Sequence, residues 1–252
     1  MKRNNNSVKA DAVEYKKLMF NPAVAENKDF TEIYKFILEY YRDRGPCPAL
    51  IFMDDGVKEP IYIKNREGME AIIVNRSSKR LYEDIKRTVR KSAALCCDED
   101  FKGIWAPWVD YGFVYMTLLA ISKRLKVPAV PLYIVKQMPV GYEKLSGLNL
   151  QNADQKTTAI ILNGTRDEIM MIKSLVHELR HVWQHMYQQE WFDDYNINLP
   201  LENYFDQITE CDAEAYAYLF VFHSCGIRLE LSVGKEKILH RVSELEKESL
   251  FW

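Results

Sequence analysis

The 252-residue sequence predicts an α+β fold, and three patterns carry this prediction. Several segments repeat apolar residues at the three- and four-residue spacing of amphipathic helices. Short β-type runs in the first third are separated by the turn sequences Asp-Asp-Gly and Arg-Glu-Gly. A further β-type run passes through Asn163-Gly164 directly into a long helical pattern. With 48% hydrophobic and 28% charged residues, the composition is that of an ordinary folded protein.

The N-terminal part is expected to combine a helix with a small sheet. Residues 30–44 place apolar side chains at helical spacing, and Gly45-Pro46 ends that helix. Three short runs follow, at 49–53, 61–64 and 71–74, and we expect them to form antiparallel strands. These elements indicate a small α+β unit.

Two more helices are expected at 79–96 and 109–125, and Trp105 and Trp108 lie between them. A tryptophan pair fits a ligand site or, more commonly, an anchor in the core or between domains. We place a domain boundary after Trp105, between the two tryptophans. The two regions are residues 1–105, an N-terminal α+β region of unknown role, and residues 106–252.

In the second region, the first expected strand follows Pro128 and Pro131. A strand is expected at 132–135, and residues 137–157, with their glycine, asparagine and polar side chains, are expected to form a loop or loose hairpin. Residues 158–162 have the composition of a strand.

A capped helix is expected to follow the turn at Asn163-Gly164. Thr165 and Glu168 have the spacing of a capping box, which satisfies free amide groups at a helix start. Another helix is expected from Ile208 to about Phe222. Residues 234–247 predict an amphipathic closing helix that packs on the core, the commoner arrangement, or on another subunit, so the oligomeric state stays open.

Charge and composition exclude several function classes. The formal charge is −2 and no basic stripe could neutralise a phosphate backbone, so we expect no nucleic-acid partner. The longest apolar runs are about half of the ~20 residues that a membrane span needs, so we expect no membrane association. Five cysteines without CxxC spacing suit a reducing compartment, and we expect a cytoplasmic protein.

The pentapeptide His177-Glu-Leu-Arg-His181 predicts a metal site. On a helix, His177 and His181 lie one turn apart and about 40° round the axis, so both imidazoles can reach one ion. Apolar residues of the same helix, such as Leu175 and Leu179, fall on the opposite face. The helix is therefore expected to bury its back and turn both histidines toward a zinc ion, with Glu178 beside it.

A third ligand must come from elsewhere, because catalytic zinc sites usually have three protein ligands. The metzincin pattern needs a glycine and a histidine where this chain has Gln184 and Tyr187, and His185 lies a full turn beyond His181. A rim or supporting role therefore suits His185 better than ligation.

The stronger candidate for the third ligand is Glu210, in the helix expected from Ile208 to about Phe222. Glu214 lies one turn on and could accept the outer N–H of a ligating histidine. Asp212 lies about 200° from Glu210, so the two cannot serve one metal from a regular helix. The alternative is that these acids only solvate a helix face, which is common for such pairs.

Together, His177-Glu-Leu-Arg-His181 and Glu210-Cys-Asp-Ala-Glu-Ala-Tyr-Ala217 resemble the zincin-like minimal gluzincin metallopeptidases, including the ImmA/IrrE-like and phage- or mobile-element-associated enzymes. The resemblance covers about residues 110–225. It implies a zinc helix, a glutamate helix and a small sheet whose edge strand, here Thr158 to Leu162, holds an extended substrate. Arg180 departs from the family pattern, which prefers an uncharged residue there; its charge would indicate an unusual cleft or a relative that no longer cuts peptides.

The function that follows is zinc-dependent endopeptidase activity on a peptide or protein substrate. His177, His181 and Glu210 would hold the zinc, and Glu178 would act as general base on the zinc-activated water. Five side chains could supply an oxyanion donor: Tyr187, Tyr204, Tyr218, His223 and Arg180. The main alternative is a catalytically inactive zincin-like regulatory or protein-binding module. A deformylase is a weaker alternative, because neither Cys96 nor Cys97 lies in the Glu-Gly-Cys sequence of that family.

Overall fold

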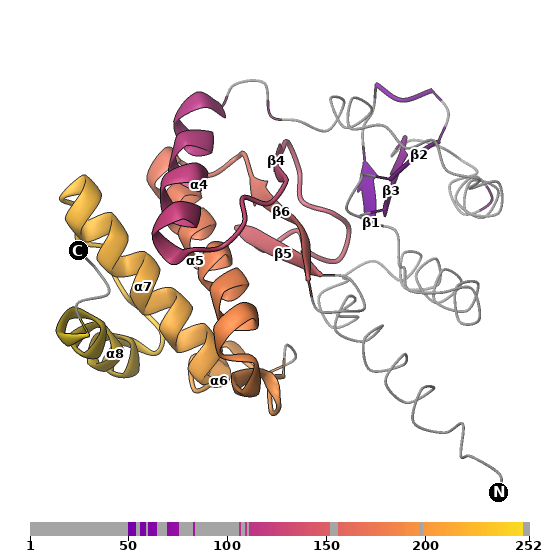
Figure 1. Cartoon of the computed structure of the whole chain (residues 1–252). Coiled ribbons are helices and arrows are strands. Elements are labelled where there is room, and N and C mark those ends of the chain that lie inside the picture. The colour runs from indigo at the N-terminus through magenta and orange to yellow at the C-terminus, as the bar shows by residue number, and fades with distance from the viewer. Residues whose placement is uncertain are drawn as a thin grey trace, which may run out of the picture. The chain divides into compact units, whose positions relative to one another are not determined.

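The structure is a computed structural model of the chain (Figure 1). The residues that it describes are 50–53, 56–58, 60–64, 70–75, 83, 106, 109, 111–151, 156–196 and 199–248. Several expected features lie outside the described residues: the helix at 30–44, the helix at 79–96 apart from residue 83, the pair Trp105 and Trp108, and Cys47, Cys96 and Cys97. The described elements are helices and small sheets, so the architecture is α+β, as predicted.

The chain divides into two compact units. One comprises Met1–Pro107, Val135–Leu145 and Leu150–Ala159, and the other comprises Trp108–Ile134, Ser146–Asn149 and Ile160–Trp252. All residues of the candidate site belong to the second unit.

The first unit contains the three short strands expected from the sequence. They are β1 (Leu50–Met53), β2 (Ile61–Lys64) and β3 (Glu70–Val74), in the order β1-β3-β2. β2 pairs antiparallel with β3, but β1 pairs parallel with it, with Leu50 opposite Ala71. The expectation of three antiparallel strands was therefore wrong for β1. The chain reverses direction between β1 and β2 and again between β2 and β3, so β1 and β3 run the same way. Because β3 takes the central position, β1 becomes its neighbour and pairs parallel with it.

The second sheet has the order β4-β6-β5 and corrects the expected edge strand. β4 spans Leu132–Val135, β5 spans Gly147–Gln151 and β6 spans Thr157–Asn163. β6 is central and buried from its second residue onward, whereas the sequence analysis placed it at the edge. The edge strand on the side away from β4 is β5, which lies in the segment expected to be a loop or loose hairpin. The amide of Asn163 donates to the carbonyl of Ser146, which joins the end of β6 to the start of β5.

Helix α5 (Glu168–Tyr187) begins two residues after the expected capping box would place it. Its cap is Asp167, whose carboxylate accepts from the amide of Met170. Thr165 belongs instead to the turn before the helix, where its amide and its hydroxyl both donate to Asn163 Oδ1. The Asn163 turn thus takes up two more residues than the sequence pattern indicated.

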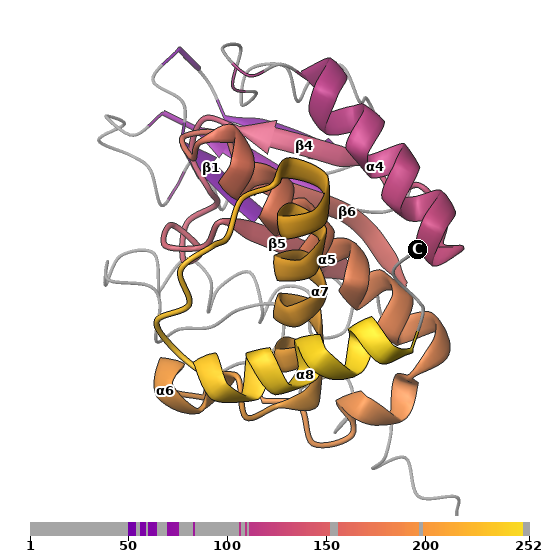
Figure 2. The same ribbon diagram turned by 90° about the vertical axis from the view of Figure 1, so that its left-hand side faces the viewer.

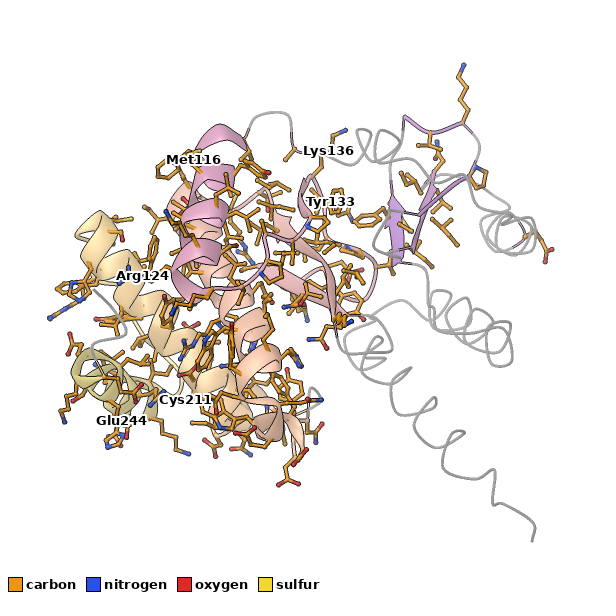
Figure 3. All side chains as sticks on the ribbon, in the orientation of Figure 1. Met116, Arg124, Tyr133, Lys136, Cys211 and Glu244 are labelled. Carbon is orange, nitrogen blue, oxygen red and sulfur yellow. The ribbon has the colours of Figure 1, made fainter. Side chains whose placement is uncertain are left out.

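Helix α5 packs against α4 (Tyr111–Leu125) and against α7 (Ile208–Cys225), as Figures 1 and 2 show. The opposite face of α4 leaves apolar side chains exposed, including Met116 (Figure 3). Between α5 and α7 the chain forms a 3-10 turn, η2 (Gln189–Phe192), and the short helix α6 (Leu201–Tyr204). This connection brings further side chains to the candidate site.

The closing helix α8 (Lys235–Lys247) packs on α7 through its apolar face (Figure 2). Ile238, Val242 and Leu245 are buried, which agrees with the expected packing on the core. Gly234 precedes α8 in the left-handed region, with φ 65°, and a Cβ there would lie 2.6 Å from Cβ of Phe205. Only glycine therefore fits this start of α8. None of the helices in the described part of the chain is long and apolar enough to cross a membrane.

Candidate metal centre

Helix α5 buries one face and turns its histidines to another. Leu175, Val176 and Leu179 are completely buried on the back of the helix, as their helical spacing predicts. His177 and His181 face α7, and their rings meet edge to face with centroids 4.7 Å apart. The sequence spacing has therefore placed the two imidazoles side by side on one face.

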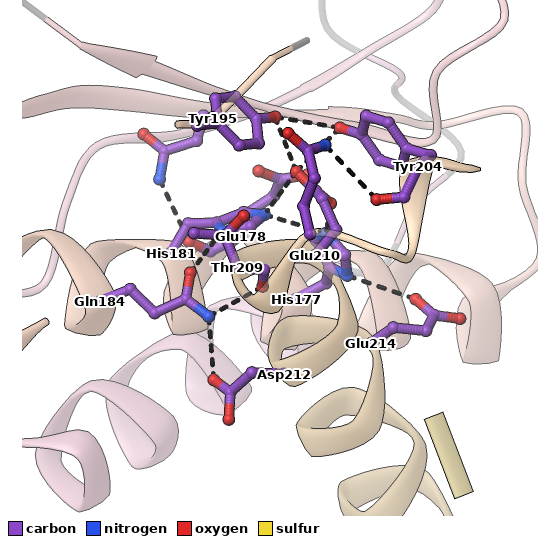
Figure 4. Close-up of polar contacts among 12 residues, drawn as sticks. His177, Glu178, His181, Gln184, Tyr195, Tyr204, Thr209, Glu210, Asp212 and Glu214 are labelled. Carbon is purple, nitrogen blue, oxygen red and sulfur yellow. Dashed lines mark hydrogen bonds and ion pairs between the residues drawn. The ribbon is translucent and has the colours of Figure 1, made fainter. Parts of the chain in front are cut away.

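Glu210, near the start of α7, completes a group of three possible metal ligands (Figure 4). His177 Nε2 lies 3.1 Å from His181 Nε2 and 3.2 Å from Glu210 Oε2. Glu210 Oε1 lies 3.6 Å from His181 Nε2. Each residue offers one atom to a common point, and all these atoms lie within 4.8 Å of one another. The group could hold a metal ion.

The outer nitrogen of each histidine faces an acceptor. His181 Nδ1 lies 2.8 Å from Gln184 Oε1, and His177 Nδ1 lies 3.3 Å from Glu214 Oε2. An amide oxygen and a carboxylate can only accept, so both Nδ1 atoms carry a proton. Glu214 takes the supporting position expected for it, and Lys173 Nζ lies 2.5 Å from its other oxygen. Burial alone would raise the pKa of Glu214, but His177 and Lys173 lower it to about 2.

The inner nitrogens, both Nε2, then present lone pairs to each other in the neutral rings. At 3.1 Å these lone pairs repel unless a cation, either a proton or a metal ion, lies between them. Without a metal, burial would lower the pKa of His177, but the carboxylates of Glu210 and Glu214 raise it to about 10. Burial would raise the pKa of Glu210, and the two histidines hold it well below its usual range. The centre is thus built to bind positive charge.

The separations also fit a small divalent ion. Ligand atoms bound tetrahedrally to zinc at about 2.0–2.2 Å lie about 3.3–3.6 Å apart. The separation of 3.1 Å between the two Nε2 atoms and that of 3.2 Å between His177 Nε2 and Glu210 Oε2 are close to this range. Two imidazoles and one carboxylate are also a donor set that zinc accepts.

Glu178 lies on the same helix between the two histidines, and β5 packs against it. A Cβ at Gly147 would lie 2.9 Å from Glu178 Oε1 and 3.1 Å from its Cγ, so only glycine leaves room for this carboxylate. The side-chain amide of Asn149 donates to the backbone carbonyl of Glu178, which ties β5 to α5. Burial raises the pKa of Glu178, and the charges of His177 and His181 oppose that shift.

Two tyrosines hold the carboxylate of Glu210. The hydroxyls of Tyr195 and Tyr204 donate to its Oε1 at 2.7 and 2.8 Å and lie 3.1 Å from each other. Tyr204 ends α6, and Tyr195 lies in the preceding connection. This leaves Oε2 as the oxygen nearer to His177.

Tyr204 is one of the five expected oxyanion donors, and its hydroxyl contacts Glu210. Two others have partners elsewhere: the hydroxyl of Tyr187 donates to the carbonyl of Lys126, and His223 Nε2 lies 3.9 Å from Glu246 Oε1. The His185 ring stacks on Phe192 with centroids 3.7 Å apart and is outside the group of three ligands.

Arg180, the arginine of the pentapeptide, points into the protein core. The residue is 1% exposed, and its Nε and Nη2 donate to the two oxygens of Asp212, at 2.7 and 3.1 Å. The guanidinium lies over the rings of Trp183, at 3.7 Å, and Tyr216, at 4.7 Å. The charge therefore does not enter the face that carries the histidines, and it does not make an unusual cleft there.

Sequence reasoning missed Gly147, Gln184 and Tyr195 at this centre. Gln184 was considered only as a departure from the metzincin pattern, although its three-residue spacing from His181 on a helix was a usable signal. Gly147 and Tyr195 reach the centre through tertiary contacts, and nothing in the local sequence marks them. No protein-family model, curated protein or solved structure matches this chain.

Proposed function

We propose that this protein is a zinc-dependent metalloendopeptidase with a zincin-like minimal gluzincin core. The observation that carries the proposal is the convergence of His177, His181 and Glu210 on one point, with Glu178 on the same helix. Three protein ligands leave a fourth position of a tetrahedral zinc site for water or substrate, which is the arrangement of catalytic zinc.

The chemistry is divided between the ion and the chain. A zinc ion supplies Lewis acidity, which makes water nucleophilic near neutral pH and polarises a substrate carbonyl group. Glu178 would accept the proton of the attacking water and deliver it to the leaving amine. Its buried carboxylate has a raised pKa, which brings it closer to the neutral range in which a general base works best.

The remaining residues would hold this arrangement in place. Glu214 and Gln184 orient the two imidazoles, and Tyr195 and Tyr204 fix the rotation of the Glu210 carboxylate. Side chains around metal ligands commonly have this role, and their loss weakens metal binding.

The substrate would be a peptide in extended form. Among the described strands, β5 lies at the edge of its sheet, and its residues Gly147 and Asn149 pack directly on Glu178. A peptide that pairs with such an edge uses backbone hydrogen bonds, which are independent of sequence. This arrangement would lay a peptide bond next to the carboxylate of Glu178.

The first experiment measures the metal content of the purified protein and of two variants. We expect about one zinc ion per chain in the wild type and in Glu178→Gln, because Glu178 is no ligand. Glu210→Ala should lose most of the zinc, since two imidazoles alone form an incomplete site. Absence of zinc from wild-type protein prepared with ample metal would overturn the proposal, and zinc retained by Glu210→Ala would overturn the ligand set.

The second experiment separates a peptidase from a binding module. Wild-type protein and Glu178→Gln are incubated with a peptide mixture, and new termini are identified by mass spectrometry. New termini should appear with the wild type and be absent with Glu178→Gln, whose zinc content is unchanged. If zinc-loaded wild-type protein produces no new termini, the protein is a metal-binding module without peptidase activity.

A further inference from the structure

The buried charges behind the metal centre form a connected network across α5, α7 and α8. Asp212 is fully buried, and Arg180 of α5 and Arg241 of α8 both donate to it, Arg241 through Nε at 2.9 Å. Gln184 of α5 donates to the same carboxylate through Nε2, also at 2.9 Å (Figure 4). One aspartate thus accepts from three side chains on two different helices.

The contacts of Gln184 determine how its side-chain amide is turned. Its Nε2 lies 2.9 Å from both Asp212 Oδ2 and the backbone carbonyl of Thr209, and these two groups can only accept. The nitrogen of the amide must therefore face α7. The oxygen of the amide then faces His181 Nδ1, at 2.8 Å.

This orientation determines which nitrogen of His181 is available to a metal. Because the amide oxygen accepts, Nδ1 must carry the proton, and the lone pair of the neutral ring is at Nε2, next to His177 and Glu210. If the amide turned over, its NH₂ group would face the Nδ1 proton, and the two donors would repel each other. Asp212 and the carbonyl of Thr209, which both accept from the amide nitrogen, oppose that turn.

Helix α8 takes part in this arrangement. Arg241 is about one-eighth exposed, and its guanidinium bridges buried Asp212 and the surface carboxylates of Glu244, at 3.0 Å, and Glu248, at 3.1 Å. The position of the Asp212 carboxylate therefore depends on α8 as well as on Arg180.

We infer that Gln184 is a positioning residue for His181, and that Asp212, held by Arg180 and by Arg241 of α8, fixes the orientation of Gln184. The closing helix thereby becomes part of the metal centre, although none of the three ligands comes from it. This inference rests on the proposed zinc site and adds to it a route by which α8 controls metal affinity.

The test measures zinc affinity by competition with a chelating dye in wild-type protein and in Gln184→Met. Methionine has nearly the same length and volume as glutamine but lacks the amide. We expect an affinity loss of roughly 10- to 100-fold, the usual effect of removing a partner of a ligating histidine. Met171→Leu is the matched control. It changes a buried side chain of the same helix by a volume-conserving substitution and touches none of the hydrogen bonds argued above; its affinity should equal that of the wild type.

The contribution of α8 is tested with Arg241→Met and with Lys237→Met as its control. Lys237 lies one turn earlier on α8 and forms an exposed ion pair with Asp206, outside the network. We expect Arg241→Met to weaken zinc binding, by less than Gln184→Met does, and Lys237→Met to leave it unchanged. Equal affinities of the two α8 variants would overturn the part assigned to α8.

A spectroscopic measurement distinguishes positioning from general loosening of the fold. In the zinc-loaded wild type, the Nδ1 proton of His181 should give a downfield proton resonance that exchanges slowly with water, because Gln184 accepts it. In Gln184→Met this resonance should shift and exchange faster. An unchanged resonance, or unchanged zinc affinity, would overturn the inference while zinc in the wild type leaves the proposed function standing. A wild type without zinc would instead overturn the proposed function.

Discussion

Replacing Arg180 by methionine should destabilise the protein strongly, and the reason lies in the buried pair that it forms. Arg180 is 1% exposed and Asp212 is fully buried, and two charge-assisted hydrogen bonds join them. Methionine keeps most of the length of the side chain but removes the guanidinium. Asp212 would then remain charged in the core with fewer donors.

The structure sets the magnitude of this effect. Removing one partner of a buried ion pair typically costs about 3–5 kcal/mol. Asp212 would keep the donors of Gln184 and Arg241, so the lower end, about 3 kcal/mol, is expected. With a urea dependence of about 2–3 kcal/mol per molar, the unfolding midpoint should fall by roughly 1–1.5 M.

The assay is urea unfolding of chelator-treated protein at pH 7, followed by far-ultraviolet circular dichroism. Burial would raise the pKa of Asp212, but its hydrogen bonds to Arg180 and Gln184 lower it below the ordinary value of 3.8. With a lowered folded pKa, the stabilisation is complete above that ordinary value and is lost as the pH falls through the folded pKa. At pH 7 the pair therefore contributes fully.

A double variant, Arg180→Met with Asp212→Leu, tests the reasoning further. It removes both buried charges and leaves Arg241 paired with Glu244 and Glu248 at the surface. Most of the lost stability should return, because replacing a whole buried pair by apolar residues is often nearly neutral. Zinc affinity should be lower than in the wild type, because Gln184 has lost one of its two acceptors, the Asp212 carboxylate. Wild-type stability in the single variant, or a further loss of similar size in the double variant, would refute this account.

Three further outcomes are expected. Gly147→Ala should lower kcat at least tenfold with zinc content unchanged, since its Cβ would displace the Glu178 carboxylate; equal kcat in peptide hydrolysis would contradict the assigned contact. Tyr195→Phe should weaken zinc binding by roughly tenfold in chelator competition, because it removes a donor to Glu210 Oε1, whereas unchanged affinity would show that Tyr204 alone suffices. Apparent zinc affinity should rise by about tenfold per pH unit between pH 6.5 and 8.5, because metal binds neutral imidazole and the pKa of His177 in the metal-free protein is about 10; a plateau above pH 7 in the same titration would argue against this pKa.

Local spacing predicted the parts of the candidate site that lie on a single helix. His177 and His181 share a face because four residues make about one turn, and the same rule related Glu210 to Glu214. The apolar back of α5 and the buried face of α8 followed from the same periodicity. The strand segments at 50–53, 61–64 and 132–135 were also recognisable from composition.

What could not be predicted depends on contacts between distant segments. The position of a strand in a sheet depends on burial in the folded protein. β6 was expected at the edge but is buried and central, and β5 is the edge strand among those described. Gly147 approaches Glu178 only because β5 lies against α5. The helix cap is Asp167 and not Thr165, whose hydroxyl donates a hydrogen bond to Asn163 Oδ1. The spacing of a capping box does not show that such a local hydrogen bond competes with the cap.

Arg180 shows the same limit for electrostatics. From the sequence of α5 alone, the charge of Arg180 indicated an unusual cleft or a relative that no longer cuts peptides. Helical geometry predicted that Asp212 faces away from Glu210 on α7. It did not predict that Arg180 and Asp212 meet, because this contact depends on how α5 and α7 pack.

The Arg180–Asp212 pair also constrains how this sequence can change over evolutionary time. A substitution at either position alone leaves a buried charge without its main partner, so most single changes there would be removed by selection. Descendants of this sequence should therefore keep both residues or replace both. Positions 180 and 212 are expected to covary in an alignment of relatives, and an uncharged residue at 180 should be accompanied by a non-acidic residue at 212.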